Sequence, residues 1–197
     1  MRKEKLLELK EYINEFKTIE KNKSLEEAKF IKVNGYNFLL NNNETIYREE
    51  IIKNNGTGSA VIVLPVTKEQ NTVLVVEPRV FTEETVGVGL PAGYIETNEQ
   101  PIIAAKRELE EETGYVSDNL IELVIFYQDE GCSRALNRSF IAIDSEKIKG
   151  QHLDESEFIR YFECTFDEAL ELVQMGYIKG ANSILTLEKA KQYLKRR

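Results

Sequence analysis

Cysteine is scarce in this sequence of 197 residues, which contains only Cys132 and Cys164. Two cysteines cannot form a disulfide scaffold, so a reducing cytoplasm is the expected location. Long apolar runs are also missing, because the longest, Ala60–Val66, is far shorter than the roughly 18 residues of a membrane-spanning helix. The charged segment Met1–Lys10 lacks the apolar core of a secretory signal. We therefore expect neither a disulfide-rich secreted protein nor a helical membrane protein.

Positive charge is in deficit, since 26 Lys and Arg stand against 34 Asp and Glu, a formal net charge of −8. An acidic protein is poorly suited to non-specific binding of nucleic acid or anionic membranes, so we expect neither partner. The hydrophobic share of 42% and charged share of 30% are typical of a folded globular chain. If the substrate is itself anionic, a cation must lie between it and this protein.

The N-terminal quarter of the chain carries two different patterns. Apolar residues at spacings of three and four predict an amphipathic helix over residues 2–19, with a stripe formed by Leu6, Leu9, Ile13 and Phe16. Short alternating runs then predict a small antiparallel sheet of two or three strands over Lys29–Lys53, with turn signals at Asn34-Gly35 and Asn41–Asn43. We interpret 1–53 as an N-terminal element and 54–197 as the main domain, with the boundary at Asn54–Gly58.

Strands and helices alternate beyond that boundary. The segments SAVIVLPV and NTVLVVE, rich in β-branched residues, predict a core hairpin joined by Lys68–Gln70. Thr165 and Glu168 form a predicted capping box at the start of a helix that Gly176 ends. Further strands are predicted at Ile121–Tyr127, Arg138–Ile143 and Phe158–Cys164, and further helices at Glu99–Thr113 and Ala181–Arg197. This order predicts an α+β fold, with helices layered on a mixed central sheet.

The most informative segment is GYIETNEQPIIAAKRELEEETGYV, residues 93–116. Thr97 or Asn98 is the predicted helix cap, and Gly114 is the predicted end. On a helical wheel, the carboxylates of Glu108, Glu111 and Glu112 share one face. The apolar residues Ile102, Ala105 and Leu109 lie on a different face. Like charges at this spacing destabilise a helix by about 0.2–0.5 kcal/mol per exposed pair, and Arg107 relieves only part of this repulsion.

A crowded set of carboxylates suits a divalent cation, because Mg²⁺ takes hard oxygen ligands and completes its shell with water and phosphates. The alternative interpretation is a solvated acidic helix face, as in most glutamate-rich helices. Three features favour the cation site: the uneven distribution of the carboxylates, the arginine among them, and the glycine-containing turn Leu90–Gly93, which can bring backbone carbonyls to the same point.

The segment resembles the Nudix box, G-x5-E-x7-R-E-U-x-E-E-x-G-U, in which U is a bulky aliphatic residue. Every fixed position is present, at Gly93, Glu99, Arg107, Glu108, Glu111, Glu112 and Gly114, and Leu109 fills the first U position. One soft position departs from the pattern, since Tyr115 stands where an aliphatic residue is usual. The resemblance implies an α/β/α sandwich that hydrolyses a nucleoside diphosphate linked to another group, using Mg²⁺ or Mn²⁺.

The resemblance also implies roles for the box residues. Its metal ligands would be the carboxylates of Glu108, Glu111 and Glu112 with the backbone carbonyl of Ala92, and Glu111 would share in catalysis. Arg107 would orient the glutamates and Glu99 would brace the loop–helix–loop, with Gly93 and Gly114 as structural positions.

The surroundings of the box are similar to the ADP-ribose and ADP-sugar pyrophosphatase branch over about residues 45–195. The strand end E-P-R and the turn L-P-A-G match upstream, and HLDESEFI, residues 152–159, resembles that branch's D-E-x-E loop. This loop implies Glu155 as general base, with Glu157 as a metal ligand or alternate base. Predicted substrate-binding residues are Arg48 and Arg79, for which surface salt bridges are the alternative, and Gly131 and Ser133.

One departure concerns the substrate. ADP-ribose-specific members usually carry a proline in the loop about fifteen residues past the box, and Glu130 stands in that place. The first hypothesis is hydrolysis of ADP-ribose or an ADP-sugar to AMP and a sugar phosphate. The alternatives are another Nudix substrate (GDP-mannose, NADH or a dinucleoside polyphosphate), a non-catalytic ADP-ribose-sensing module, and a prenyl diphosphate isomerase. The branch further implies a homodimer formed through the N-terminal sheet.

Overall fold

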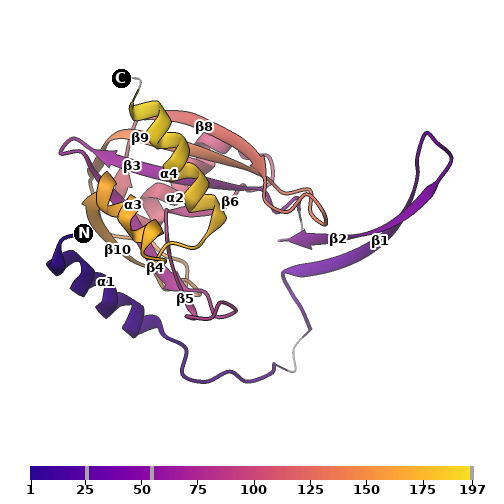
Figure 1. Ribbon diagram of the computed structural model, residues 1–197, viewed down its shortest axis with the longest axis horizontal. Helices are drawn as coiled ribbons and strands as arrows, with labels where there is room; N and C mark the ends of the chain where they lie inside the picture. The colour runs from indigo at the N-terminus through magenta and orange to yellow at the C-terminus, as the bar shows by residue number, and fades with distance from the viewer. Residues whose placement is uncertain (25–26, 54–55, 196–197) are drawn as a thin grey trace.

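The computed structural model describes residues 1–24, 27–53 and 56–195 (Figure 1). Its helices are α1 (Lys3–Phe16), α2 (Pro101–Thr113), α3 (Phe166–Gln174) and α4 (Ala181–Leu194). Its strands are β1 (Ile31–Leu39), β2 (Thr45–Lys53), β3 (Ala60–Thr67), β4 (Asn71–Pro78), β5 (Val86–Gly89), β6 (Ala92–Tyr94), β7 (Tyr115–Val116), β8 (Asn119–Tyr127), β9 (Leu136–Lys147) and β10 (Arg160–Thr165).

The central sheet has eight strands and is mixed, as predicted. Its main path runs β10-β4-β3-β9-β7, while β5, β6 and β8 pair with β4, β3 and β9 respectively. β3 and β9 run parallel, and the other pairs are antiparallel. β3 and β4 are almost wholly buried, which is why their sequences read as continuous apolar runs and not as alternating ones.

Helices cover both faces of this sheet, because side chains alternate between the faces along each strand. Ile62, Leu64 and Leu74 face one core, to which α1, α3 and α4 contribute. Val61, Val63 and Val73 face the second core, where α2 packs through Ala104, Ala105 and Leu109. The predicted layering of helix, sheet and helix is therefore confirmed (Figure 1).

Helix α1 is confirmed, although it ends at Phe16 and not at residue 19. Leu9 of its stripe is fully buried in the main core. Arg2 just before the helix donates to both carboxylate oxygens of Glu168, at 2.9 and 2.8 Å, and these bonds lower the pKa of Glu168 to about 2. At the other end, Arg160 pairs with Glu15 at 3.0 and 2.7 Å. α1 is thus fastened to α3 and β10.

The strands β1 and β2 form a separate two-stranded antiparallel sheet, which projects from the body (Figure 1). One predicted turn is wrong: Asn34-Gly35 lies within β1, opposite Glu50 and Glu49. Gly35 serves packing here, because a Cβ would overlap the ring of Tyr47. The actual turn is Asn41–Asn43, where Asn43 has a φ of 66°.

Three sequence predictions within the main domain need correction or extension. Neither Thr97 nor Asn98 caps α2; Gln100 is the N-cap and Pro101 opens the helix, where the missing N–H costs nothing. Ile102 is 39% exposed, and Ala104 takes its place on the buried face. β9 runs from Leu136 to Lys147 and so extends beyond both ends of the strand predicted at Arg138–Ile143. The capping box of Thr165 and Glu168 is confirmed.

The predicted division of the chain at residue 53 remains a prediction, and Asn54 and Asn55 at this boundary lie outside the described residues. The last two residues of the predicted C-terminal helix also lie outside them. In the described part of the chain, no helix has the length and apolar character required to cross a bilayer.

Candidate active site

Arg107, in the middle of α2, is the centre of a charged network. Its guanidinium bonds both carboxylate oxygens of Glu99, at 3.0 Å each, and the carbonyl oxygen of Tyr94 at 3.0 Å. One further nitrogen donates to Glu108 at 2.7 Å and to Glu111 at 3.0 Å. The pairing lowers the pKa of Glu99. One arginine therefore holds three carboxylates and ties the helix to the loop before it.

Glu108 is buried beneath this network, with 7% of its surface exposed. Burial raises the pKa of Glu108 to about 7, against the opposing effect of Arg107. Gly93 in β6 makes room for it, because a Cβ at this position would overlap the Glu108 carboxylate. The box glycine and the first box glutamate after Arg107 are thus in direct contact, although they are fifteen positions apart in the sequence.

Glu112 lies one turn further along α2 and is 5% exposed. Its Oε2 accepts a hydrogen bond from the backbone N–H of Ala92 at 3.0 Å. Burial first, and then the negative charges of Glu77 and Glu108, raise the pKa of Glu112 well above its usual range. The structure therefore brings together three of the predicted metal ligands, Ala92, Glu108 and Glu112. Glu111 is the outer member of the set, with a side chain that is 40% exposed.

Glu77 was not among the predicted site residues. It is the last residue but one of β4 and opens the Glu-x-Arg strand end, and this motif was the signal that could have identified it. Burial raises the pKa of Glu77, while its ion pair with Arg79, at 2.5 Å, works against this rise. Because its charge acts on Glu112, Glu77 belongs to the same cluster, and it brings the predicted substrate residue Arg79 to the cluster's edge.

The loop at 152–158 carries the predicted base. Glu155 and Glu157 are both exposed on this loop, and Glu157 accepts a bond from the backbone N–H of Asp154 at 3.1 Å. The charge of Glu157 contributes to the raised pKa values of Glu77, Glu108 and Glu112. The loop therefore lies close to the carboxylates of α2.

The other predicted substrate residues lie where the projecting sheet meets the body. Cys132, between Gly131 and Ser133, accepts a bond at its carbonyl from the N–H of Ile51 in β2, at 2.7 Å. Arg48 in β2 donates to the carbonyl of Tyr47 in its own strand, at 2.7 Å, and no contact in the described part of the chain joins it to the glutamates. Gly131 and Ser133 thus flank the residue that bonds β2, and Arg48 lies three positions before Ile51 in the same strand.

The donor set fits a divalent cation in its chemistry. Hard carboxylate oxygens are concentrated around Glu108 and Glu112, which are buried and carry raised pKa values, so a bound cation would offset the unfavourable charge. Within the described ranges, no three His, Cys, Asp or Glu side chains are already arranged around one point. Instead, Arg107 engages Glu108 and Glu111, and the Ala92 amide engages Glu112.

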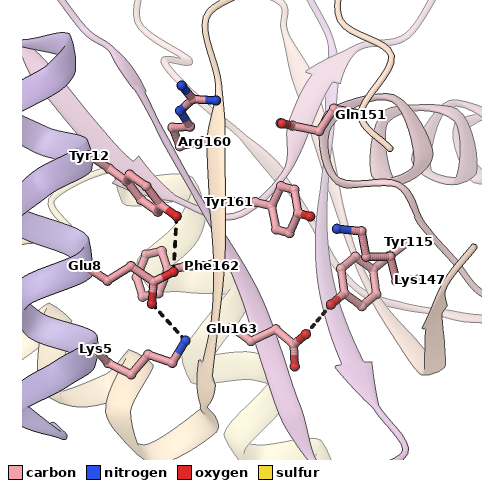
Figure 2. A pocket seen from close by; sticks show the side chains of 10 residues that line it. All are labelled: Lys5, Glu8, Tyr12, Tyr115, Lys147, Gln151, Arg160, Tyr161, Phe162 and Glu163. Atoms are coloured by element: carbon pink, nitrogen blue, oxygen red, sulfur yellow. Dashed lines mark hydrogen bonds and ion pairs between the residues drawn. The ribbon is translucent and has the colours of Figure 1, made fainter. Parts of the chain in front are cut away.

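A cavity in the described part of the chain lies beside this cluster and not over it. It measures about 450 Å³ and opens between α1, β10 and the residues after α2 (Figure 2). Its polar groups bond one another: Tyr12 and Lys5 bond Glu8, and Tyr115 bonds Glu163. Lys147 lies 4.3 Å from the centre of the Tyr161 ring. Most of the polar groups that line the cavity are therefore already hydrogen-bonded to one another.

Comparison with known proteins identifies a single domain type. The sequence model of the NUDIX domain matches residues 56–195. An ADP-ribose pyrophosphatase of Bacillus subtilis (strain 168) is 35% identical over 142 residues, which are 72% of this chain and 75% of that protein. A protein of Bacillus methanolicus named methanol dehydrogenase activator is 34% identical over 175 residues, 88% of this chain and 91% of that one.

More distant proteins are also similar to this chain. A GDP-mannose pyrophosphatase of Escherichia coli (strain K12) is 29% identical over 178 residues, 86% of this chain and 92% of that protein. A crystal structure described as that of an ADP compounds hydrolase superposes with a TM-score of 0.74, at 21% identity, covering 88% of this chain and 91% of the other. At that identity the superposition supports the fold alone.

Proposed function

Because this chain belongs to the Nudix family, we propose that it hydrolyses the pyrophosphate bond of ADP-ribose or a related ADP-sugar, giving AMP and a sugar phosphate. The observation that carries the proposal is the set of bonds around Arg107, which gathers Glu99, Glu108 and Glu111 beside the buried Glu112. An acidic cluster held in this way by an arginine suits a cation-assisted reaction on a diphosphate better than it suits a solvated helix surface.

In this mechanism Glu108 and Glu112, with the carbonyl of Ala92, would hold Mg²⁺ or Mn²⁺, supported by Glu111. A divalent cation, when bound, offsets phosphate charge and lowers the pKa of a coordinated water. Glu155 is our candidate to accept the proton of the attacking water, because it lies on the loop next to the cluster; Glu157 is the alternate base or a further ligand. Arg107 keeps the carboxylates oriented throughout.

Substrate binding would use the cationic side chains at the edge of the cluster. Arg79 can pair with phosphate oxygens, since Glu77 already holds its guanidinium beside the glutamates. Arg48, Gly131 and Ser133 would contact the rest of the nucleotide sugar where β2 meets the loop. No partner of nucleic-acid or membrane type enters this proposal, and the expected location is the cytoplasm.

The choice of ADP-ribose rests on the relative of Bacillus subtilis, whose name states that substrate. The test is a panel of ADP-ribose, ADP-glucose, GDP-mannose, NADH and a dinucleoside tetraphosphate with Mg²⁺, read by chromatography of the products. Fastest release of AMP from ADP-ribose supports the proposal. Faster turnover of GDP-mannose assigns the chain to the other substrate class, and no turnover of any compound favours a sensing or activating role.

We further propose that the projecting sheet forms a homodimer interface. Both of its strands expose large apolar side chains, which a monomer would leave in water; they are Ile31, Val33, Tyr36, Phe38, Leu39 and Tyr47. A second copy of this chain would cover these side chains. The base of the sheet is joined to the loop that contains Gly131 and Ser133, so a dimer formed there would also shape the substrate site.

Charge placed on this sheet is expected to separate the dimer. The double variant Tyr36→Asp/Phe38→Asp alters two rings on one face of β1, whose centres lie 6.1 Å apart. We expect light scattering to give twice 22.7 kDa for the wild type and 22.7 kDa for the variant, with KM increased. Asn42→Asp at the tip of the same sheet is the matched control and should remain dimeric. A monomeric wild type would refute the proposal.

A further inference from the structure

The last turn of α2 is capped by residues from elsewhere in the chain. A helix leaves its final carbonyls without partners in the helix, and these oxygens need other donors. The carbonyl of Glu110 receives the N–H of Gly114 at 2.8 Å, and that of Glu111 receives the N–H of His152, also at 2.8 Å. The carbonyl of Glu112 receives the side-chain nitrogen of Gln151 at 2.6 Å. The loop that follows β9 therefore supplies two of these caps.

Gln151 has a second partner at the far end of the same loop. The same side-chain nitrogen donates to the carbonyl oxygen of Ile159 at 3.1 Å. A primary amide has two N–H groups, so one nitrogen can serve both carbonyls. Gln151 and Ile159 stand on either side of residues 152–158, which include Glu155 and Glu157. One side chain thus joins the two ends of this loop to each other and to the backbone of Glu112.

The exit of the loop has an independent fastening. Arg160 follows Ile159 directly and pairs with Glu15 of α1 in a two-bond contact. Gln151 and Arg160 both line the cavity between α1 and β10 (Figure 2). Because the other polar groups of this cavity already bond one another, no ligand is required to explain it. Two groups therefore link α2 directly to the loop, the side chain of Gln151 and the backbone N–H of His152, and of the two only Gln151 also reaches the loop's far end.

We propose that Gln151 is a positioning residue, which sets the loop carrying Glu155 and Glu157 against the carboxylates of α2. This proposal rests on the proposed hydrolase function. The two groups of carboxylates come from segments about forty residues apart, and they must act on one water and one diphosphate. A misplacement of about 1 Å is enough to lower a rate by about 10²-fold, so a bond that fixes their relative position matters for turnover and less for substrate affinity.

The test uses three substitutions that differ in hydrogen-bonding character. Gln151→Glu keeps the size but presents an acceptor to two carbonyls, and Gln151→Leu removes the donor. For both we expect kcat to fall about tenfold or more while KM changes less than about threefold. Gln151→Lys restores a donor with three N–H groups, and its kcat should exceed that of the Glu variant by about fivefold. Gln174→Leu, on the surface of α3, is the matched control.

A second measurement does not depend on catalysis. Hydrogen exchange followed by mass spectrometry should show faster exchange of the peptide covering 152–158 in the Glu and Leu variants than in the wild type, at temperatures well below melting. Unchanged exchange together with unchanged kcat in Gln151→Glu would overturn the proposal. Equal losses in the Lys and Glu variants would also overturn it, because the donor would then not matter. Should the wild type hydrolyse no nucleotide sugar, the exchange result still decides whether Gln151 holds the loop.

Discussion

Replacement of Glu112 with glutamine is expected to lower kcat by about 10²-fold or more, with little loss of stability. Glutamine has nearly the same size and its amide oxygen can still accept the bond from the Ala92 N–H, so the local fold should persist. What is lost is a buried negative charge next to Glu108 and Glu77, which is the charge that would hold a cation. The measurement is steady-state hydrolysis of ADP-ribose across a range of Mg²⁺ concentrations, with thermal melting as a check on folding.

Glu110→Gln is the control for this variant, because Glu110 belongs to the same helix turn but pairs with Lys149 at the surface. It should retain activity within about twofold of the wild type. Calorimetric titration with Mg²⁺ alone should show weaker binding for the Glu112 variant and no change for the Glu110 variant. Wild-type turnover by Glu112→Gln would remove the cluster from the mechanism.

Replacement of Gly114 with alanine is expected to have the largest effect on stability. Gly114 ends α2 with a φ of 75°, a conformation that costs other L-residues about 1–2 kcal/mol. A Cβ would also meet the backbone carbonyl of Lys149, which cannot rotate away as a side chain can. We expect a total loss of about 2–4 kcal/mol, which corresponds to a fall in melting temperature of about 5–15 °C for a chain of this size.

The matched control is Gly180→Ala. Gly180 precedes α4 with a φ of −67°, and no atom lies within 4 Å of a Cβ placed there. Its melting temperature should stay within about 2 °C of the wild type. If Gly114→Ala melts as high as this control, the backbone geometry at the end of α2 is not what requires glycine.

Much of the fold was predictable because its signals are local. The apolar runs of β3 and β4, the capping box at Thr165 and the glycine that ends α2 are each encoded within a few residues. The turn predicted at Asn34-Gly35 was wrong because the structure there depends on a distant part of the chain. The pair has strong turn character, but it lies within a strand, and the contact between the glycine and the ring of Tyr47, twelve residues away along the chain, is evident only once the strands are paired.

The candidate site was predictable where one motif carries it. The spacing from Gly93 to Gly114 identified the residues that now lie around Arg107, since neighbours on one helix converge by geometry alone. Glu77 and Gln151 were missed because each joins the cluster through a different segment of the chain. For Glu77 the Glu-x-Arg strand end was the one local signal, but it does not show that the side chain is half-buried beside Glu112. A glutamine in a polar loop, such as Gln151, has no local pattern that distinguishes it from ordinary surface residues.

The attachment of α1 has a consequence for biosynthesis. Arg2 bonds Glu168, 166 positions later, and Leu9 enters a core completed by α3 and α4. α1 also packs on β4 and β5, but its packing surface is complete only when β10, α3 and α4 are in place, and contacts of such separation form slowly. During synthesis, part of its apolar stripe therefore stays exposed to chaperones and to other nascent chains.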